Sequence, residues 1–390
     1  MKHNFDEIIN RKSTHSLKWD CCKERFNSDD ILPMWVADMD FRSPAQVIDA
    51  IKRRAEHGVF GYTETSEKLS DALQIWMKKR NRWDIDKRWI VHTPGVVTSV
   101  NASILAFTDV DDKVLMQTPI YYPFFSSISE NGRQLVVNPL KNSGGAYEID
   151  FEDLEKKLGS GVKMMILCSP HNPIGRVWKR EELEQVARLC LKYDVLLVSD
   201  EIHSDLVFED YAHIPAASVS EEILNASITL ISPTKTFNLA GLSESMAIIP
   251  NPEHRQSFKR TLHRTGAGML NIFGLEAAEA AYAHGEDWLE ELLAYLQANL
   301  ETLVEYFESH IPRIKVIRPE ATYLAWLDCH ELPVAADKLK EFFTFKARVG
   351  LNDGVTFGKE GAGFQRMNFA CPRGLLLEGL ERIKKAVALL

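Results

Sequence analysis

The chain has 390 residues, of which 45% are hydrophobic and 26% charged, and its formal net charge is −9. This length exceeds one ordinary hydrophobic core, so we expect two domains. A negative balance with both signs mixed along the chain argues against nucleic-acid binding. No apolar run reaches the ~20 residues that span a bilayer, and the polar N-terminus lacks a signal-peptide pattern. The six cysteines form no C-x-x-C pair and the histidines show no ligand spacing, so we expect no metal site and a reducing, cytoplasmic location.

Residues 1–45 are predicted to be irregular, and they include the stretch Met34–Phe41, in which acids interrupt an apolar run. Such a stretch is more often a packed connecting loop than a site. A helix is predicted from Ser43 to about Glu56, because a serine cap and a first-turn proline precede an amphipathic pattern. The loop that follows carries two glycines among aromatic residues and ends at Tyr62, which by itself is typical of a half-buried core tyrosine.

Strand and helix patterns alternate from 90 to 250, which predicts a mostly parallel sheet covered on both faces. In the first unit, Gly95 separates a strand from a helix predicted over 98–107. Backbone N–H groups at such a helix N-terminus suit a phosphate, although the same pattern fits an ordinary strand–helix turn. The next strand is followed by Tyr121 and Tyr122, and adjacent aromatic residues at such a position are usually core residues.

Three apolar strands are each followed by a polar residue, in the order Asn172, Asp200 and Lys235. Ligands of open α/β sheets bind beyond the carboxyl ends of the strands, so these side chains should share one site. Partial desolvation would lower the pKa of the lysine and make it nucleophilic toward aldehydes, and Ser232 and Thr234 beside it could donate to a phosphate. The lysine segment alone fits a polar surface turn equally well. An aldehyde-reactive lysine with a buried acid is the arrangement that pyridoxal phosphate (PLP) requires.

This ordered set of motifs resembles the fold-type I PLP enzymes of the class I/II aminotransferase family. Within that family, the segments 34–41, 60–62 and 199–205 are similar to the bacterial cystathionine β-lyase (cysteine-S-conjugate β-lyase) branch. The resemblance extends from about Trp19 to the C-terminus. It implies an α/β fold with a large domain built on a mostly parallel central sheet and a smaller α/β C-terminal domain.

The resemblance also implies how the chain is divided. An N-terminal segment, 1–45, would pack with the small domain. The large PLP-binding domain would cover 46–285, and the small C-terminal domain would cover 286–390. The N-terminal part of the last unit, 286–309, has a helical pattern long enough to bridge the two domains.

Site roles follow from the same resemblance. Lys235 would attach to the cofactor aldehyde and then act as a base, Asp200 would pair with the pyridinium nitrogen, and Tyr121 would stack on the ring. Tyr62 would reach the cofactor phosphate of the neighbouring subunit in a homodimer. The residues expected to contact the cofactor are Tyr62, Gly95, Val96, Val97, Tyr121, Asn172, Asp200, His203, Ser232, Thr234 and Lys235.

The α-carboxylate of an amino-acid substrate is expected to bind Arg366, with Ala37 and Asn172 beside it, because the planar guanidinium fork suits a carboxylate. The alternative for this arginine is an edge-strand position paired to a surface acid. Arg373 is the second candidate for the carboxylate, although a structural role suits its turn better.

The same residues would serve two reactions: β-elimination of a thiol from a cysteine-derived thioether, or transamination of an L-amino acid. Two departures from the family pattern favour the lyase. His203 stands where many aminotransferases carry a tyrosine, and Ser243 stands where they carry a phosphate-binding arginine. A third hypothesis, a non-catalytic cofactor-binding regulator, ranks last because the chain has no helix-turn-helix pattern or basic arm.

Overall fold

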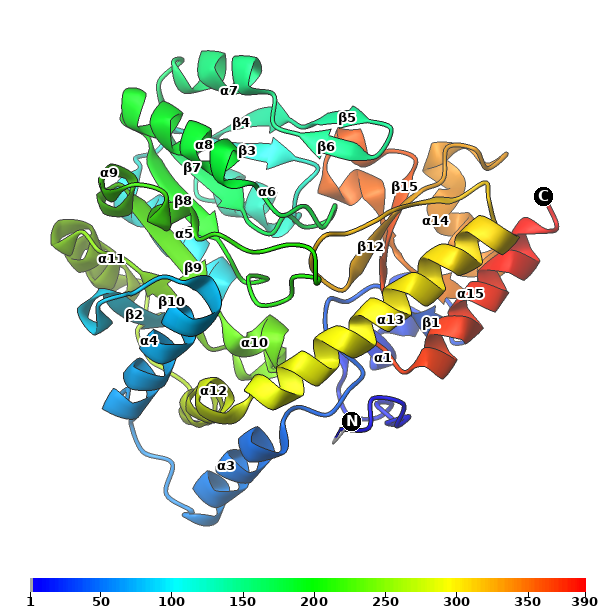
Figure 1. Ribbon diagram of the computed structural model, residues 1–390, viewed down its shortest axis with the longest axis horizontal. Coiled ribbons are helices and arrows are strands. Elements are labelled where there is room, and N and C mark those ends of the chain that lie inside the picture. The colour runs from blue at the N-terminus through cyan, green and yellow to red at the C-terminus, as the bar shows by residue number, and fades with distance from the viewer. Residues whose placement is uncertain (1–2) are drawn as a thin grey trace.

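The computed structural model describes residues 3–390. Its centre is a seven-stranded sheet with the strand order β2-β10-β9-β8-β7-β3-β4 (Figure 1). The strands are β2 (Ile90–Thr93), β3 (Lys113–Thr118), β4 (Gln134–Pro139), β7 (Val162–Cys168), β8 (Leu196–Asp200), β9 (Ser227–Ile231) and β10 (Ser245–Ile248). The strand β10 runs opposite to the other six strands. The predicted mostly parallel sheet is confirmed.

Both faces of this sheet are buried, which explains the continuous apolar strands of the sequence. Val114 and Met116 of β3 enter one core, whereas Leu115 between them enters the core on the opposite face. The first of these cores is closed by α5 (Val96–Phe107), α6 (Pro123–Ser129) and α11 (Pro252–Arg264). The opposite core is closed by α7 (Phe151–Leu158) and α8 (Arg180–Lys192), with α9 (Glu221–Asn225) beside them.

Three further helices, α3 (Ala45–Glu56), α4 (Glu67–Asn81) and α12 (Ile272–His284), pack together beside β10. The small hairpin β5 (Lys141–Ser143) and β6 (Ala146–Glu148) and the one-turn helix α10 (Pro233–Thr236) complete this part of the chain. In Figure 1 the long yellow helix α13 (Glu286–His310) runs from α12 toward the C-terminal elements.

A second, four-stranded antiparallel sheet has the order β11-β12-β15-β14. Its strands are β11 (Lys315–Ile317), β12 (Leu324–Asp328), β14 (Asn352–Asp353) and β15 (Phe364–Asn368). It is accompanied by α14 (Leu339–Glu341) and by α15 (Arg373–Val387), which packs on α13. The division of the chain at 45 and 285 stays a prediction.

The N-terminal segment is more regular than predicted. It contains α1 (Leu17–Asp20), α2 (Cys22–Phe26) and the short strand β1 (Leu32–Pro33). β1 pairs in parallel with β13 (Val349–Gly350), a strand from the far end of the chain. The prediction missed these elements because the strand pairing is non-local and each helix is about one turn long.

Two helix starts also differ from the prediction. The predicted serine cap of α3 is wrong, because Pro44 takes the cap position and the Ser43 hydroxyl donates to the backbone oxygen of Asn238 at 3.2 Å. Helix α5 begins at Val96, two residues early, directly after Gly95 with its positive φ of 106°. Within residues 3–390 no helix combines the length and apolarity needed to cross a membrane.

Candidate active site

The carboxyl ends of β7, β8 and β9 lie side by side, as the sequence predicted, and they surround a cavity of about 200 Å³. The N-terminus of α5 and the segment around Ala37 close its other sides. The predicted site residues that line this cavity are Ala37, Gly95, Val96, Val97, Tyr121, Asn172, Asp200, His203, Thr234 and Lys235. Residues from six separate stretches of the sequence therefore meet in one place.

Lys235 lies on the one-turn helix α10, four residues beyond the end of β9. Its Nζ donates a hydrogen bond to the backbone oxygen of Ala37 at 2.6 Å. Burial lowers the pKa of this amine to about 8, although the carboxylate of Asp38 opposes the shift. Near neutral pH the amine is therefore neutral far more often than that of an ordinary lysine, and the neutral form is the one that attacks an aldehyde.

Asp200 is the last residue of β8, and only 4% of it is exposed. Its Oδ1 accepts a hydrogen bond from the backbone N–H of Ile202 at 3.1 Å, and its carboxylate forms no ion pair within residues 3–390. Burial raises its pKa to about 7, and the negative charge of Glu201 adds to this effect. A buried acid without a cationic partner fits a ligand that brings a protonated ring nitrogen.

The first turn of α5 and Thr234 together form one end of the cavity, the end where the sequence predicted a phosphate. The first N–H groups of a helix have no partner within the helix and favour an anion. Apart from its chain neighbours, no protein atom lies within 4 Å of the position that a Cβ on Gly95 would take, so the approach is open. Ser243 also lines the cavity.

Ser232 is placed differently from its predicted neighbours. Its hydroxyl caps α10 by accepting from the backbone N–H of Thr234 at 3.1 Å, and it donates to the backbone oxygen of Glu244 at 2.7 Å. It does not belong to the cavity lining. The structure thus commits this hydroxyl to holding the lysine-bearing turn, and its predicted contact with the cofactor stays untested.

The remaining wall carries two neutral rings. His203 is 2% exposed and its Nδ1 has no hydrogen-bond partner within residues 3–390. Burial lowers the pKa of this imidazole to about 3, so the ring is uncharged. Burial also raises the pKa of the Tyr121 phenol to about 12. A flat aromatic ligand can therefore pack against these two rings without contacting a charged side chain.

Arg366 lies on β15, between β12 and β14, so the edge-strand alternative is wrong. It is 3% exposed, and burial lowers its pKa to about 10. One terminal nitrogen donates to Oδ1 of Asn172 at 3.0 Å, and the other donates to Oδ1 of Asn352 at 2.7 Å and to the backbone oxygen of Trp35 at 3.1 Å. Its Nε has no partner among residues 3–390. Because these hydrogen-bond partners are all neutral, the charge of the buried guanidinium is available to pair with a carboxylate.

The segment Trp35–Met39, which we call the strap, crosses between the two sheets. The Nδ2 of Asn368 donates to the carbonyl oxygens of Val36 and Asp38, each at 2.6 Å. The hydroxyl of Tyr323 donates to the carbonyl oxygen of Ala37 at 3.0 Å. On the other side, Asn238 Oδ1 accepts from the backbone N–H of Met39 at 2.9 Å. The sequence analysis missed the residues that hold the strap, because bonds to backbone carbonyls leave no motif.

A buried charge cluster anchors the same segment. The Lys18 ammonium, 1% exposed, lies 2.6 Å from Oδ2 of Asp40, and the Arg11 guanidinium binds Asp38 at 2.6 Å and Asp40 at 2.7 Å. The burial of these charges is compensated by the close pairing of opposite signs. Removing one partner would leave an uncompensated charge beside the wall of the site.

The positions of Arg373 and Tyr62 bear on two further predictions. The Nε of Arg373 donates to Oδ1 of Asn299 at 3.1 Å, and its guanidinium lies over the ring of Tyr295, which is a structural arrangement. Tyr62 is 98% exposed and lines no part of the cavity of its own chain. Its contact with a neighbouring subunit stays a prediction.

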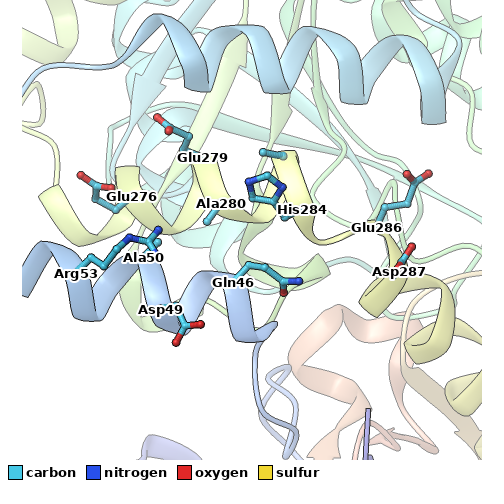
Figure 2. A pocket seen from close by; sticks show the side chains of 11 residues that line it. Gln46, Asp49, Ala50, Arg53, Glu276, Glu279, Ala280, His284, Glu286 and Asp287 are labelled. Atoms are coloured by element: carbon cyan, nitrogen blue, oxygen red, sulfur yellow. The ribbon is translucent and has the colours of Figure 1, made fainter. Parts of the chain in front are cut away.

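A larger hollow, about 590 Å³, lies between α3 and α12, away from Lys235 (Figure 2). Its charged lining consists of Asp49, Arg53, Glu276, Glu279, His284, Glu286 and Asp287. The excess of carboxylates opposes a phosphate, and the lining includes no lysine. The smaller cavity at the strand ends is therefore the site with the chemistry that the sequence predicted.

Residues 29–383 match the family described as aminotransferase class I and II, and the chain belongs to that family. Over 386 residues it is 44% identical to the cystathionine beta-lyase PatB of Bacillus subtilis (strain 168), covering 99% of this chain and 100% of the relative.

Two solved structures share the fold. Cystalysin from Treponema denticola, which contains a pyridoxal 5′-phosphate cofactor, superposes with a TM-score of 0.96 at 37% identity and covers 100% of this chain and 99% of its own. The PLP-bound C-S lyase from Staphylococcus hominis gives a TM-score of 0.93 at 35% identity and covers 99% and 98%. The predicted fold class is confirmed.

Proposed function

We propose that this chain is a PLP-dependent carbon–sulfur β-lyase that removes a thiol from an L-cysteine-derived thioether such as cystathionine. The observation that carries the proposal is the pairing, in one cavity, of a lysine whose pKa burial lowers to about 8 with a buried aspartate that has no cationic partner among residues 3–390. The full-length similarity to proteins named as cystathionine and C-S lyases supports the choice of reaction.

The residues present fit the cofactor. Lys235 would hold its aldehyde carbon, Asp200 its ring nitrogen, and the first turn of α5 with Thr234 its phosphate. When bound, PLP supplies an electron-withdrawing ring that stabilises negative charge at the α-carbon of an amino acid. Asp200 would serve this chemistry as the anion beside the ring nitrogen, because a cation at that position would offset the burial that raises its pKa.

The substrate-facing residues bind, orient and move a proton. Arg366 binds the α-carboxylate, while Asn172 and Asn352 orient its guanidinium. The amine of Lys235 takes the α-proton, for which a pKa near 8 is well matched to neutral pH. The carbon–sulfur bond then breaks, and water completes the balance: one thioether and one water give one thiol, pyruvate and ammonium.

Incubation of the PLP-loaded protein with cystathionine, without any keto acid, tests the reaction. Thiol and pyruvate should be released continuously in equal amounts, because β-elimination consumes only the thioether and water and needs no keto acid. A single turnover that stops, and restarts when pyruvate or 2-oxoglutarate is added, would instead identify an aminotransferase. A variant with Lys235→Ala serves as the control for uncatalysed thiol release.

The proposal includes a homodimer with shared sites. Tyr62, Phe60 and Met269 line an exposed groove of about 510 Å³, and these three side chains are 98%, 59% and 71% exposed. Exposed aromatic and methionine side chains in one groove are typical of a surface that a protein partner covers. A second copy would bring Tyr62 toward the phosphate end of the neighbouring cavity. All six cysteines are free thiols, which supports the proposed cytoplasmic location.

A further inference from the structure

Strand β10 lies between the two elements that form the end of the cavity where a phosphate is expected, which we call the phosphate end. One neighbour, β2, leads into the first turn of α5, and the other, β9, leads into the turn that carries Lys235 (Figure 1). The first residue of β10 is Ser245, and it pairs directly with Thr93, the last residue of β2. Both residues are 0% exposed. Two buried hydroxyl groups therefore lie side by side next to the start of α5.

A third buried hydroxyl group completes a hydrogen-bonded cluster at this point. The hydroxyl oxygen of Thr93 lies 2.6 Å from that of Ser245 and 2.6 Å from that of Ser99 in α5. Ser99 is also 0% exposed. Each hydroxyl carries one hydrogen, and each has an acceptor within this cluster or on the backbone beside it. The cluster is therefore satisfied without a ligand and serves the elements that it joins.

The cluster fixes the backbone of Gly95, the residue that precedes α5. The N–H of Gly95 donates to the hydroxyl oxygen of Ser245 at 3.1 Å and to the backbone oxygen of Thr93 at 2.9 Å. The carbonyl oxygen of Gly95 accepts from the backbone N–H of Ser99 at 3.1 Å. A glycine with a φ of 106° has little conformational preference of its own, so the direction in which α5 begins depends on these contacts.

That direction decides how the phosphate end can bind an anion. Because α5 begins after Gly95, the N–H groups of Val96, Val97 and Thr98 have no partner within the helix, and these three residues line the cavity. The lining includes no arginine side chain. A phosphate at this end would be held by backbone N–H groups, which cannot swing toward a ligand as a long side chain can. Their placement before binding therefore controls the affinity.

The residue before Ser245 holds the opposite side of the phosphate end. The backbone oxygen of Glu244 accepts the hydroxyl of Ser232 at 2.7 Å. The hydroxyl oxygen of Ser232 lies 2.6 Å from that of Thr234, which lines the cavity. Two consecutive residues at the start of β10 therefore hold both the beginning of α5 and the turn that carries the lysine, and they set the distance between the two sides.

We propose that Thr93, Ser99 and Ser245 are positioning residues for the cofactor phosphate, and that their hydroxyl cluster holds the first turn of α5 in the orientation that the phosphate requires. The three hydroxyl groups act through the backbone around Gly95 and do not contact the phosphate themselves. The inference rests on the proposed function through the cofactor alone, because elimination and transamination would need the same phosphate contact. Loss of the cluster should therefore weaken the binding of the phosphate group and leave the binding of the pyridine ring unchanged.

Reversible binding of two cofactor analogues to the cofactor-free full chain tests this role. Pyridoxine 5′-phosphate and pyridoxine differ only in the phosphate group, and neither has an aldehyde that could attach to Lys235. In calorimetric titration, the wild-type protein should bind the phosphorylated analogue more tightly. Thr93→Val keeps the shape of the side chain but removes the hydroxyl, so the affinity for pyridoxine 5′-phosphate should fall about tenfold, as for one lost buried hydrogen bond. The affinity for pyridoxine should stay unchanged, and Thr93→Ser, which keeps the hydroxyl, should bind both analogues like wild type.

The matched control is Thr229→Val in β9. Thr229 is likewise 0% exposed, but its hydroxyl has no partner among residues 3–390, so both affinities should stay at the wild-type values. Ser245→Ala provides a second variant if Thr93→Val does not fold, and it should show the same selective loss. An equal loss for both analogues, an unchanged affinity for the phosphorylated analogue, or the same loss in Thr229→Val would each overturn the proposal. Failure to cleave a thioether would not alter these binding results, so the two proposals fail separately.

Discussion

The Nζ of Lys235 lies 2.6 Å from the backbone oxygen of Ala37, a residue 198 positions earlier in the chain. The same oxygen accepts the hydroxyl of Tyr323 at 3.0 Å. One carbonyl of the strap therefore joins the lysine that follows β9 of the large sheet to the tyrosine that precedes β12 of the small sheet. Because the strap also lines the cavity, its position controls both the amine and the wall that faces a substrate.

Replacement of the cavity lysine tests its attachment to the cofactor. Lys235→Ala should abolish turnover and leave the protein folded, because the amine forms no ion pair within residues 3–390 and its hydrogen bond is to a backbone carbonyl. Borohydride reduction of the wild-type protein followed by peptide mapping should place the pyridoxyl group on this residue. The exposed Lys259→Ala serves as the control and should behave like wild type. An adduct on another lysine would contradict the assignment.

Asp200→Asn should retain the cofactor but slow α-proton removal by orders of magnitude, because the ring nitrogen loses the anion that keeps it protonated. The measurement is kcat for thioether cleavage, together with the cofactor content of the purified variant. Asp210→Asn, an exposed aspartate in the segment that follows, is the matched control. Turnover of Asp200→Asn close to the wild-type value would mean that the aspartate is structural.

The stability of the cofactor-free protein should depend on pH through the same aspartate. Its pKa is raised from 3.8 to about 7 in the folded chain, so the folded state binds more protons than the unfolded state between these values. The free energy of unfolding should therefore fall as pH rises through this window. Asp200→Asn should remove that slope and be more stable than wild type at about pH 8, with little difference near pH 4, in chemical denaturation. Identical slopes in both proteins would contradict the shifted pKa.

Arg366→Lys should mainly weaken substrate binding, because a single ammonium cannot reproduce the planar fork that Asn172 and Asn352 hold in place. We expect kcat/KM for the thioether to fall by about a hundredfold, as for the loss of one bidentate charge-assisted contact. Arg373→Lys should change kcat/KM little, since that side chain contacts Asn299 and Tyr295. The opposite ranking of the two variants would move the carboxylate site to Arg373.

Mixed dimers test whether Tyr62 serves the neighbouring subunit. Lys235→Ala subunits and Tyr62→Ala subunits should each be inactive or severely impaired alone. After random mixing, half of the dimers would combine both types and each would contain one intact site, so about a quarter of wild-type activity should return. A fully active monomer in solution would rule out the shared site.

The sequence by itself determined the sheet and the placement of its polar strand ends. Apolar strands β7, β8 and β9 read as buried, and parallel neighbours necessarily end at one edge, so Asn172, Asp200 and Lys235 could be brought together without coordinates. The glycine before α5 was also recognisable, because a strand–glycine–helix turn is a local pattern. These inferences depend on periodicity and on residue type, which a sequence displays directly.

Only the tertiary structure decided how the site is held. The strap is fixed by bonds to its backbone carbonyls from Tyr323, Asn368 and Asn238, and any residue type at the carbonyl positions would offer the same acceptor. The hydroxyl of Ser232 caps the turn that carries the lysine, a contact that the sequence did not predict, while its predicted phosphate contact stays a prediction. The lowered pKa of Lys235 likewise depends on how much water the folded chain removes around its amine, and desolvation is a property of packing in three dimensions.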